Sequence, residues 1–137
     1  MDKAMTGGCL CGDLRWKAHA PPRYMGLCYC ADCRKASGSG FAPFMGFDAA
    51  TLTITGRWTV HTLTHADGRS ATRNSCVVCG GLVFGGAFGK SDVYNIYAGS
   101  LDDATQFKPT VALFTRDKPD WLEIPPGLKQ FETMPPG

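Results

Sequence analysis

Three cysteines, Cys28, Cys30 and Cys33, fall within the stretch CYCADC of this 137-residue chain. Cysteine thiolates at such spacings are typical ligands of zinc in proteins. No fold needs three cysteines so close together as ordinary core side chains, so the stretch predicts a metal site.

The other four cysteines form a C-x-C pair and a C-x-x-C pair, each beside glycines that allow a tight bend. A closed structural zinc takes four ligands, whereas a catalytic zinc commonly takes three from the protein. Seven cysteines divide most simply in this way. The closed site then holds Cys9, Cys11, Cys76 and Cys79, and the open site holds Cys28, Cys30 and Cys33.

Three other interpretations of the cysteines remain open. Disulfides are disfavoured by the odd number of cysteines and by the lack of an apolar secretion signal at residues 1–5. A thioredoxin-like role for the C-x-x-C pair would need a βαβ pattern around it, which the sequence lacks. A fourth protein ligand at the second site would make both sites structural, and the candidates are Asp32, His19, His61 and His65.

Composition and charge argue against several classes of function. The formal net charge of +2 comes without a basic stripe, which argues against a nucleic-acid-binding surface. No segment approaches the ~20 apolar residues that a membrane-spanning helix needs. Without a signal peptide, and with closely spaced thiols, the chain is expected to be cytoplasmic. Its length fits a single domain over residues 1–137.

The elements that must position these sulfurs are mostly strands. The 17 glycines and 9 prolines separate short apolar runs, which is typical of a mainly β protein with little helix. One short helix is expected from Ala31 to Ser37, ended by Gly38, and a hairpin is expected around Asp67-Gly68. Irregular coil is predicted for residues 125–137. Strands are predicted at 13–19, 23–27, 41–47, 52–55, 58–65, 69–75, 82–84, 93–98 and 111–115.

Polar residues directly after the three-cysteine stretch are candidates for substrate contacts. Arg34 and Lys35 could attract carboxylates, although a solvated helix face would explain them too. Ser37 could line a pocket together with residues 38–41, or simply close a turn. The remaining side chains of interest are expected to be exposed strand charges (Arg69, Arg73, Lys90), surface histidines on one strand face (His61, His65) and core tryptophans (Trp58, Trp121).

Taken together, these motifs resemble the glutathione-dependent formaldehyde-activating enzyme family. The match runs nearly end to end and is more specific for the family than for the substrate. Family members often carry a histidine in the strand corresponding to residues 111–115, where this chain has Leu113 and Phe114. The matching segments are 8–12 (GCLCG), 28–35 (CYCADCRK), 37–38 (SG), 76–80 (CVVCG), 99–103 (GSLDD), 118–121 (KPDW) and 127–132 (GLKQFE).

The resemblance implies small, mostly antiparallel β-sheets in a β-tent arrangement around two zinc ions. The family activity adds the thiol of glutathione to formaldehyde, giving S-hydroxymethylglutathione, and is classed with the carbon–sulfur lyases. The implied partners are a small-molecule thiol and an aldehyde. The implied ligands are Cys9, Cys11, Cys76 and Cys79 for a structural zinc, and Cys28, Cys30 and Cys33 for a catalytic zinc. The competing hypothesis is a non-catalytic, zinc-stabilised scaffold that binds a protein partner.

The chemistry expected at the open site follows from the pKa of a thiol. A free thiol with a pKa of about 8.5 is largely protonated at neutral pH. A thiol bound at an open zinc position is deprotonated and held beside the aldehyde carbon. The missing fourth ligand is therefore where the substrate sulfur is expected.

Overall fold

The computed structural model describes residues 4–136. Residues 1–3 and Gly137, the last residue of the predicted coil, lie outside the described residues. Within that range the chain forms eleven strands, one α-helix and four short 3-10 helices. The prediction of a mainly β protein with little helix is confirmed. None of the helices between residues 4 and 136 combines the length and the apolar character needed to cross a membrane.

The smaller sheet has three antiparallel strands in the order β1-β2-β5. They are β1 (Thr6–Gly8), β2 (Arg15–Ala18) and β5 (Leu52–Thr55). Strand β1 was not predicted, because a three-residue strand with two glycines carries no strand pattern. A Cβ atom at Gly7 would overlap the carbonyl oxygen of Ser100, so glycine permits a close approach of two backbones here.

The larger sheet runs in the order β11-β10-β3-β4-β9-β8-β7-β6. Its strands are β3 (Tyr24–Cys28), β4 (Ala42–Asp48), β6 (Trp58–Thr64), β7 (Ser70–Cys76), β8 (Leu82–Gly85), β9 (Val93–Tyr97), β10 (Val111–Leu113) and β11 (Lys129–Gln130). Most neighbours are antiparallel, but β10 pairs parallel with both β3 and β11. The sheets are thus mostly antiparallel, as the resemblance implies. Strand β11 interrupts the segment predicted as coil, because a two-residue strand leaves no pattern to detect.

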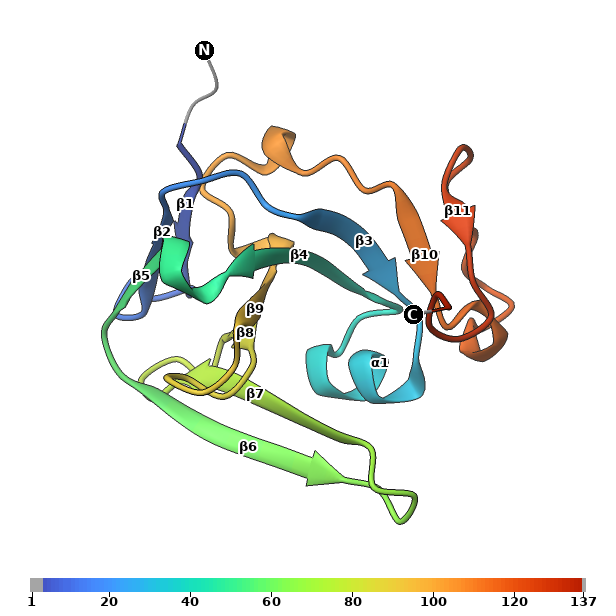
Figure 1. Ribbon diagram of the computed structural model, residues 1–137, viewed down its shortest axis with the longest axis horizontal. Coiled ribbons are helices and arrows are strands. Elements are labelled where there is room, and N and C mark those ends of the chain that lie inside the picture. Colours follow the sequence, from blue (N-terminus) through green and yellow to red (C-terminus); the bar gives the residue numbers. More distant parts are fainter. Residues whose placement is uncertain (1–3, 137) are drawn as a thin grey trace.

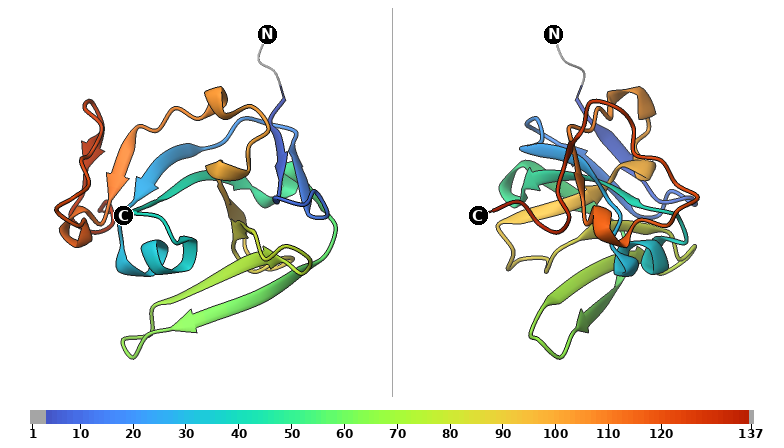
Figure 2. Two further views of the ribbon diagram at one scale, coloured as in Figure 1. Left: turned by 180° about the vertical axis from the view of Figure 1, so that it is seen from behind. Right: turned by 90° about the vertical axis from the view of Figure 1, so that its right-hand side faces the viewer.

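The larger sheet curls so that its two ends lie on opposite sides of the helix α1 (Ala31–Ser37) (Figure 1). Strands β3 and β4 lie on one side of α1, and the hairpin of β6 and β7 lies on the other, as the views in Figure 2 also show. The hairpin turns at Asp67-Gly68 as predicted, with Gly68 at a φ of 90°. A short helix is thereby enclosed by strands that are distant in the sequence.

The main core lies between the two sheets. Trp16 of β2 packs there with Phe47 of β4 and Ile96 of β9, and all three are almost completely buried. The indole N–H of Trp16 donates to the hydroxyl of Ser100 at 2.9 Å, which satisfies the one polar group of this side chain. A second, smaller core of Leu27, Tyr29 and Ala112 forms where β3 meets β10.

The opposite face of the larger sheet carries the side chains that surround α1. Along β9, Ile96 is buried in the main core, and its neighbour Tyr97 faces the other way. Along β7, Asn74 is completely buried, and Arg73 beside it is only partly buried. Because successive residues of a strand alternate between faces, Arg73 and Tyr97 project on the side where α1 lies.

Two expectations about the C-terminal third are wrong. Strand β10 ends at Leu113, two residues early, because Phe114 adopts a left-handed conformation with φ 55° and ψ 44° before a 3-10 turn. Trp121, predicted to be in the core, is 73% exposed, because it lies in an irregular segment. The four 3-10 helices are η1 (Ala49–Thr51), η2 (Ala98–Ser100), η3 (Ala104–Gln106) and η4 (Thr115–Asp117).

Candidate functional site

The first candidate site joins the amino-terminal loop to the end of β7 and the turn that follows it. The sulfur atoms of Cys9, Cys11, Cys76 and Cys79 all lie within 4.8 Å of one another. The Sγ atoms of Cys9 and Cys11 are 3.6 Å apart, and those of Cys11 and Cys76 are 3.7 Å apart. A tetrahedron of sulfurs around zinc, with bonds of about 2.3 Å, has edges of about 3.8 Å. The donor set therefore fits a tetrahedral metal ion that prefers thiolates, such as zinc.

Backbone amides support this four-cysteine cluster. The N–H of Leu14 donates to the Sγ of Cys9, and the N–H of Val78 donates to the Sγ of Cys76, each at 3.3 Å. Such donors favour the thiolate form of a ligand and fix its direction. None of the seven cysteines, all of which lie in the described range, forms a disulfide. The structure thus gives no support to the disulfide interpretation.

The second candidate site forms where β3 passes into α1. Cys28 is the last residue of β3, Cys30 is the N-cap of α1, and Cys33 lies in its first turn. The Sγ of Cys30 accepts the N–H of Cys33 at 3.2 Å, as an N-cap side chain does. The three sulfurs lie within 4.8 Å of one another. The start of one helix thereby directs two sulfurs to the same point, and the end of a strand adds the third.

The thiols of this three-cysteine cluster oppose one another's ionisation. Hydrogen bonds to Cys30 and to Cys33, together with burial, raise the pKa of Cys28 strongly. Hydrogen bonds from Cys28 and Cys33 lower the pKa of Cys30. One thiolate is therefore favoured and a second disfavoured, so three thiolates together require a cation among them. This donor set also fits a metal ion.

The described residues give this cluster no fourth protein ligand. No histidine or carboxylate between residues 4 and 136 joins the three sulfurs within 4.8 Å. The carboxylate of Asp32 contacts His65 instead, with 2.6 Å between Oδ2 and Nε2. His19 contacts the hydroxyl of Thr53 at 2.9 Å, and His61 is exposed. The interpretation with two closed structural sites has no support from the candidates that were considered.

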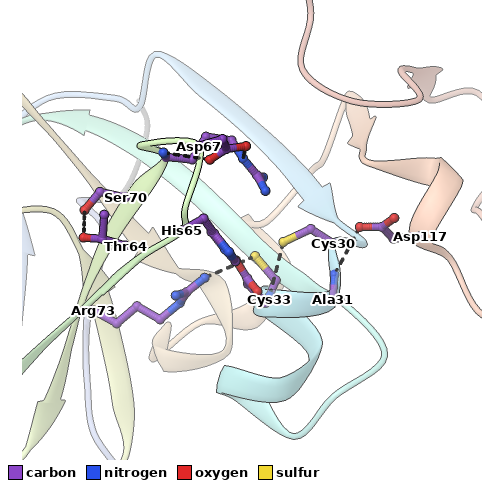
Figure 3. A network of polar contacts seen from close by, with 11 residues as sticks. Cys30, Ala31, Cys33, Thr64, His65, Asp67, Ser70, Arg73 and Asp117 are labelled. Atoms are coloured by element: carbon purple, nitrogen blue, oxygen red, sulfur yellow. Dashed lines mark hydrogen bonds and ion pairs between the residues drawn. The ribbon is translucent and has the colours of Figure 1, made fainter.

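The β6–β7 hairpin supplies two side chains to the three-cysteine cluster. Figure 3 shows His65 pointing from the end of the hairpin toward the start of α1, and Arg73 reaching from β7 toward Cys33. The Nη2 atom of Arg73 lies 3.9 Å from the Sγ of Cys33. Although burial acts to lower it, the pKa of Arg73 is raised by the nearby Tyr97 and Cys33. A permanent positive charge therefore lies beside one of the three sulfurs.

Tyr97 completes this side of the site. Its hydroxyl faces the guanidinium of Arg73, and each group shifts the pKa of the other. Burial is the main cause that raises the pKa of Tyr97 to about 12. At neutral pH the Tyr97 hydroxyl is therefore protonated and can donate a hydrogen bond.

The other side of the cluster is held by β10 and η4. The carboxylate of Asp117 accepts the N–H of Ala31 at the start of α1, at 3.3 Å. The N–H of Tyr29 donates to the carbonyl oxygen of Leu113 at 2.9 Å. Leu113 pairs in register with Cys28, so a buried leucine lies beside the cluster at the strand where the resemblance leads one to look for a histidine.

The predicted substrate residues Arg34, Lys35 and Ser37 all lie on α1. Lys35 and Ser37 are exposed, whereas Arg34 is partly buried and its Nε lacks a hydrogen-bond partner within the described structure. The hydroxyl of Ser37 donates to the carbonyl oxygen of Cys33 at 2.7 Å and accepts the N–H of Ser39 at 3.2 Å. Ser37 thus closes the end of the helix. A role of these three residues in substrate binding stays a prediction.

Sequence reasoning did not identify the neighbours that the fold brings to the cluster. Arg73 was expected to be an exposed strand charge and His65 a surface residue, yet both are partly buried and face α1. Tyr97 and Asp117 are not among the predicted site residues. Alternation along β7 predicts that the side chains of Arg73 and the buried Asn74 lie on opposite faces of the sheet. Only the curl of the sheet, however, brings the face that carries Arg73 to α1.

A surface depression of about 350 Å³ lies beside the four-cysteine cluster, with Cys9, Gly81 and Arg15 among its lining residues. The guanidinium of Arg15 is already paired with the carboxylate of Asp102, with 2.9 Å between Nη1 and Oδ1. The positive charge of Arg15 in this depression is therefore neutralised, and the neighbouring cluster already has four sulfur ligands. The chemistry favours the three-cysteine cluster as the functional site.

A family model described as glutathione-dependent formaldehyde-activating enzyme matches residues 4–117, a range that includes all seven cysteines. The same chain gives no match among curated proteins.

Proposed function

Since the chain belongs to the glutathione-dependent formaldehyde-activating enzyme family, we propose that it is a zinc-dependent enzyme of the carbon–sulfur lyase type. It activates a thiol, with glutathione as the expected substrate, for reversible addition to formaldehyde or a related small carbonyl. The observation that carries the proposal is the contrast between a cluster of four cysteines and a cluster of three. A site with three protein ligands leaves one position for substrate.

The residues that would hold the catalytic ion are Cys28, Cys30 and Cys33. When bound, the ion supplies positive charge that favours the thiolate form of the substrate thiol. The hydrogen bond from the backbone N–H of Cys33 to the Sγ of Cys30 fixes the Cys30 sulfur before any ligand arrives. Such pre-organisation lowers the cost of orienting the reactants.

The reaction itself forms one bond and moves one proton. The substrate thiol gives its proton to solvent, a lone pair of its sulfur forms the bond to the aldehyde carbon, and the π pair of the carbonyl moves to oxygen, which takes up a proton from solvent. Tyr97 keeps its proton at neutral pH because burial raises its pKa to about 12. Its hydroxyl is therefore a hydrogen-bond donor on this side of the site.

Helix α1 is proposed to contact the rest of the substrate. Arg34 and Lys35 follow Cys33 on this helix and carry positive charge that complements the carboxylates of glutathione. Lys35 is exposed, so salt should weaken its contribution. Ser37 keeps the end of α1 folded through its bond to Cys33 and would act on the substrate through the adjoining loop.

The proposal also covers the domain organisation, the fold type and the metal content of the protein. Residues 1–137 form one domain, its two sheets correspond to the β-tent of the family, and each chain binds two zinc ions. The four-cysteine cluster, with its sulfur spacings of 3.6 and 3.7 Å, is the structural site.

The test is glutathione-dependent consumption of formaldehyde by the zinc-loaded protein and its Cys30→Ser variant, with metal content measured on both. Cys30→Ser should abolish activity and remove one zinc while the protein stays folded. The matched control is Cys79→Ser, which should remove the other zinc and lower stability. An unchanged rate in Cys30→Ser would show that the three-cysteine cluster is not catalytic. A wild-type protein with two zinc ions but no activity would favour the scaffold hypothesis.

A further inference from the structure

Arg73 differs from most arginines of this chain in its partners. Arg73 forms none of the arginine–carboxylate ion pairs of the described residues, and its guanidinium lies beside the thiol of Cys33, with 3.9 Å between Nη2 and Sγ. A partly buried cation without a carboxylate needs another anion. The arginines that do pair with an aspartate are Arg15, Arg23, Arg57, Arg69 and Arg116.

The sheet leaves room for the Arg73 side chain on the side of the cluster. Arg73 pairs in register with Gly85 of the neighbouring strand β8. A Cβ atom at Gly85 would lie 3.1 Å from the hydroxyl oxygen of Tyr97, so the Tyr97 ring reaches over this glycine. The guanidinium and the hydroxyl therefore share the space above Gly85, and Tyr97 restricts where the guanidinium can go.

Charge at the three-cysteine cluster explains why a fixed cation matters there. Three thiolates around a divalent ion carry a net charge of −1, and a fourth thiolate brings the total to −2. In a partly buried site this second negative charge is costly, whereas a neutral fourth ligand adds no charge. A guanidinium next to Cys33 offsets the added charge and so favours the anionic ligand.

We propose that Arg73 is a specificity-determining residue of the three-cysteine cluster, whose charge selects a thiolate over a neutral ligand as the group added beside Cys28, Cys30 and Cys33. Tyr97 is the positioning residue that holds the guanidinium in place. The inference rests on the proposed function, because it concerns the same site. In the binding step the thiol loses its proton to solvent and its sulfur keeps the electron pair.

The experiment uses the protein loaded with Co²⁺, whose visible absorption reports the ligands of the metal. Wild type, Arg73→Gln, Arg73→Lys and Tyr97→Phe are each titrated with glutathione, with 2-mercaptoethanol and with imidazole, a neutral ligand. Arg73→Gln should weaken the binding of both thiols by about tenfold, the effect of one charge in a partly buried site. Imidazole binding should change by less than about twofold, because no charge is added. Arg73→Lys should restore most of the thiol affinity, and Tyr97→Phe should fall between Arg73→Gln and wild type.

The matched control is Arg69→Gln on the same hairpin. Arg69 is exposed and already paired with Asp67, with 2.8 Å between Nε and Oδ2, so its loss should leave all three affinities within about twofold. An equal loss of thiol and imidazole binding in Arg73→Gln would mean a structural role and overturn the inference, as would no loss at all. Failure of the wild-type protein to bind either thiol would instead overturn the proposed function.

Discussion

The Nε2 atom of His65 lies 2.6 Å from the Oδ2 atom of Asp32, and this contact joins the end of the β6–β7 hairpin to the first turn of α1. Asp32 stands between Cys30 and Cys33 in the sequence, so this contact is made within the three-cysteine stretch itself. The side chains of His65 and Asp32 are 34% and 31% exposed, so water screens the contact only in part. The hairpin is thereby fixed to the start of α1 by a contact between two side chains.

His65→Ala should loosen the hairpin. The amides of residues 62–72 should exchange hydrogen faster, because this contact fixes the hairpin end to α1, and stability should fall by about 0.5 kcal/mol, as for a partly exposed pair. Hydrogen-exchange mass spectrometry measures the first effect and denaturant unfolding the second. The control is His61→Ala, an exposed position on β6, the strand that ends just before His65. Equal exchange in the two variants would contradict a fixing role for His65.

Cys76→Ser should destabilise the protein more than Cys33→Ser. Cys76 is 2% exposed and joins β7 to the amino-terminal loop, so loss of the metal site proposed there would separate distant parts of the chain. The cost should reach several kcal/mol, as expected where metal binding contributes to folding. Cys33 lies in a short helix near the other two ligands and should cost less. Thermal unfolding with zinc analysis of both variants compares them, and the opposite order would reverse the assignment of structural and functional sites.

The stability of the protein should fall in strongly alkaline solution because of Tyr97. Its pKa is raised to about 12, mainly by burial, so the folded state binds the phenolic proton more tightly than the unfolded chain, where tyrosine titrates near ~10. This contribution is complete below about pH 10 and is lost as the pH rises through about 12. Tyr97→Phe should therefore flatten the decline, and denaturant unfolding over that range measures it. A decline of the same size in Tyr97→Phe would assign the effect to other groups.

Phe114→Gly should be more stable than Phe114→Ala by about 1 kcal/mol, because a residue with a Cβ is strained in the left-handed region and glycine is not. Phe114 is the one non-glycine residue between 4 and 136 with a positive φ, at 55°. Both variants remove the ring, so the comparison isolates the backbone. Denaturant unfolding at neutral pH gives the two free energies. Equal stabilities would mean that the turn before η4 relaxes once the ring is gone.

The sequence predicts the local features of this fold well. Helix α1 and strand β5 have the predicted bounds, and the hairpin turns at Asp67-Gly68. These features depend on short signals, namely a glycine at the end of a helix and alternating residues beside a tight turn. The division of the cysteines also comes from spacing, and the structure brings the same two groups together.

Long-range features could not be predicted from the sequence. The parallel pairing of β10 with β3 brings Leu113 to Cys28, although 85 positions separate them, and neither strand carries a signal for its partner. Arg73 and Tyr97 meet at the three-cysteine cluster only because the larger sheet curls around α1. The exposure of Trp121 was missed because aromatic residues in general favour burial, and an irregular segment can leave one outside.

The positions of the two clusters along the chain have a consequence for biosynthesis. Cys28, Cys30 and Cys33 emerge from the ribosome almost together, whereas Cys11 must wait for Cys76, a partner 65 positions later. A nascent chain that ends before Cys76 therefore offers metal one complete cluster, and the two amino-terminal thiols remain open to oxidation in that interval. The cluster proposed for catalysis is thus the first that the growing chain can fill, and the cluster proposed to be structural is the last.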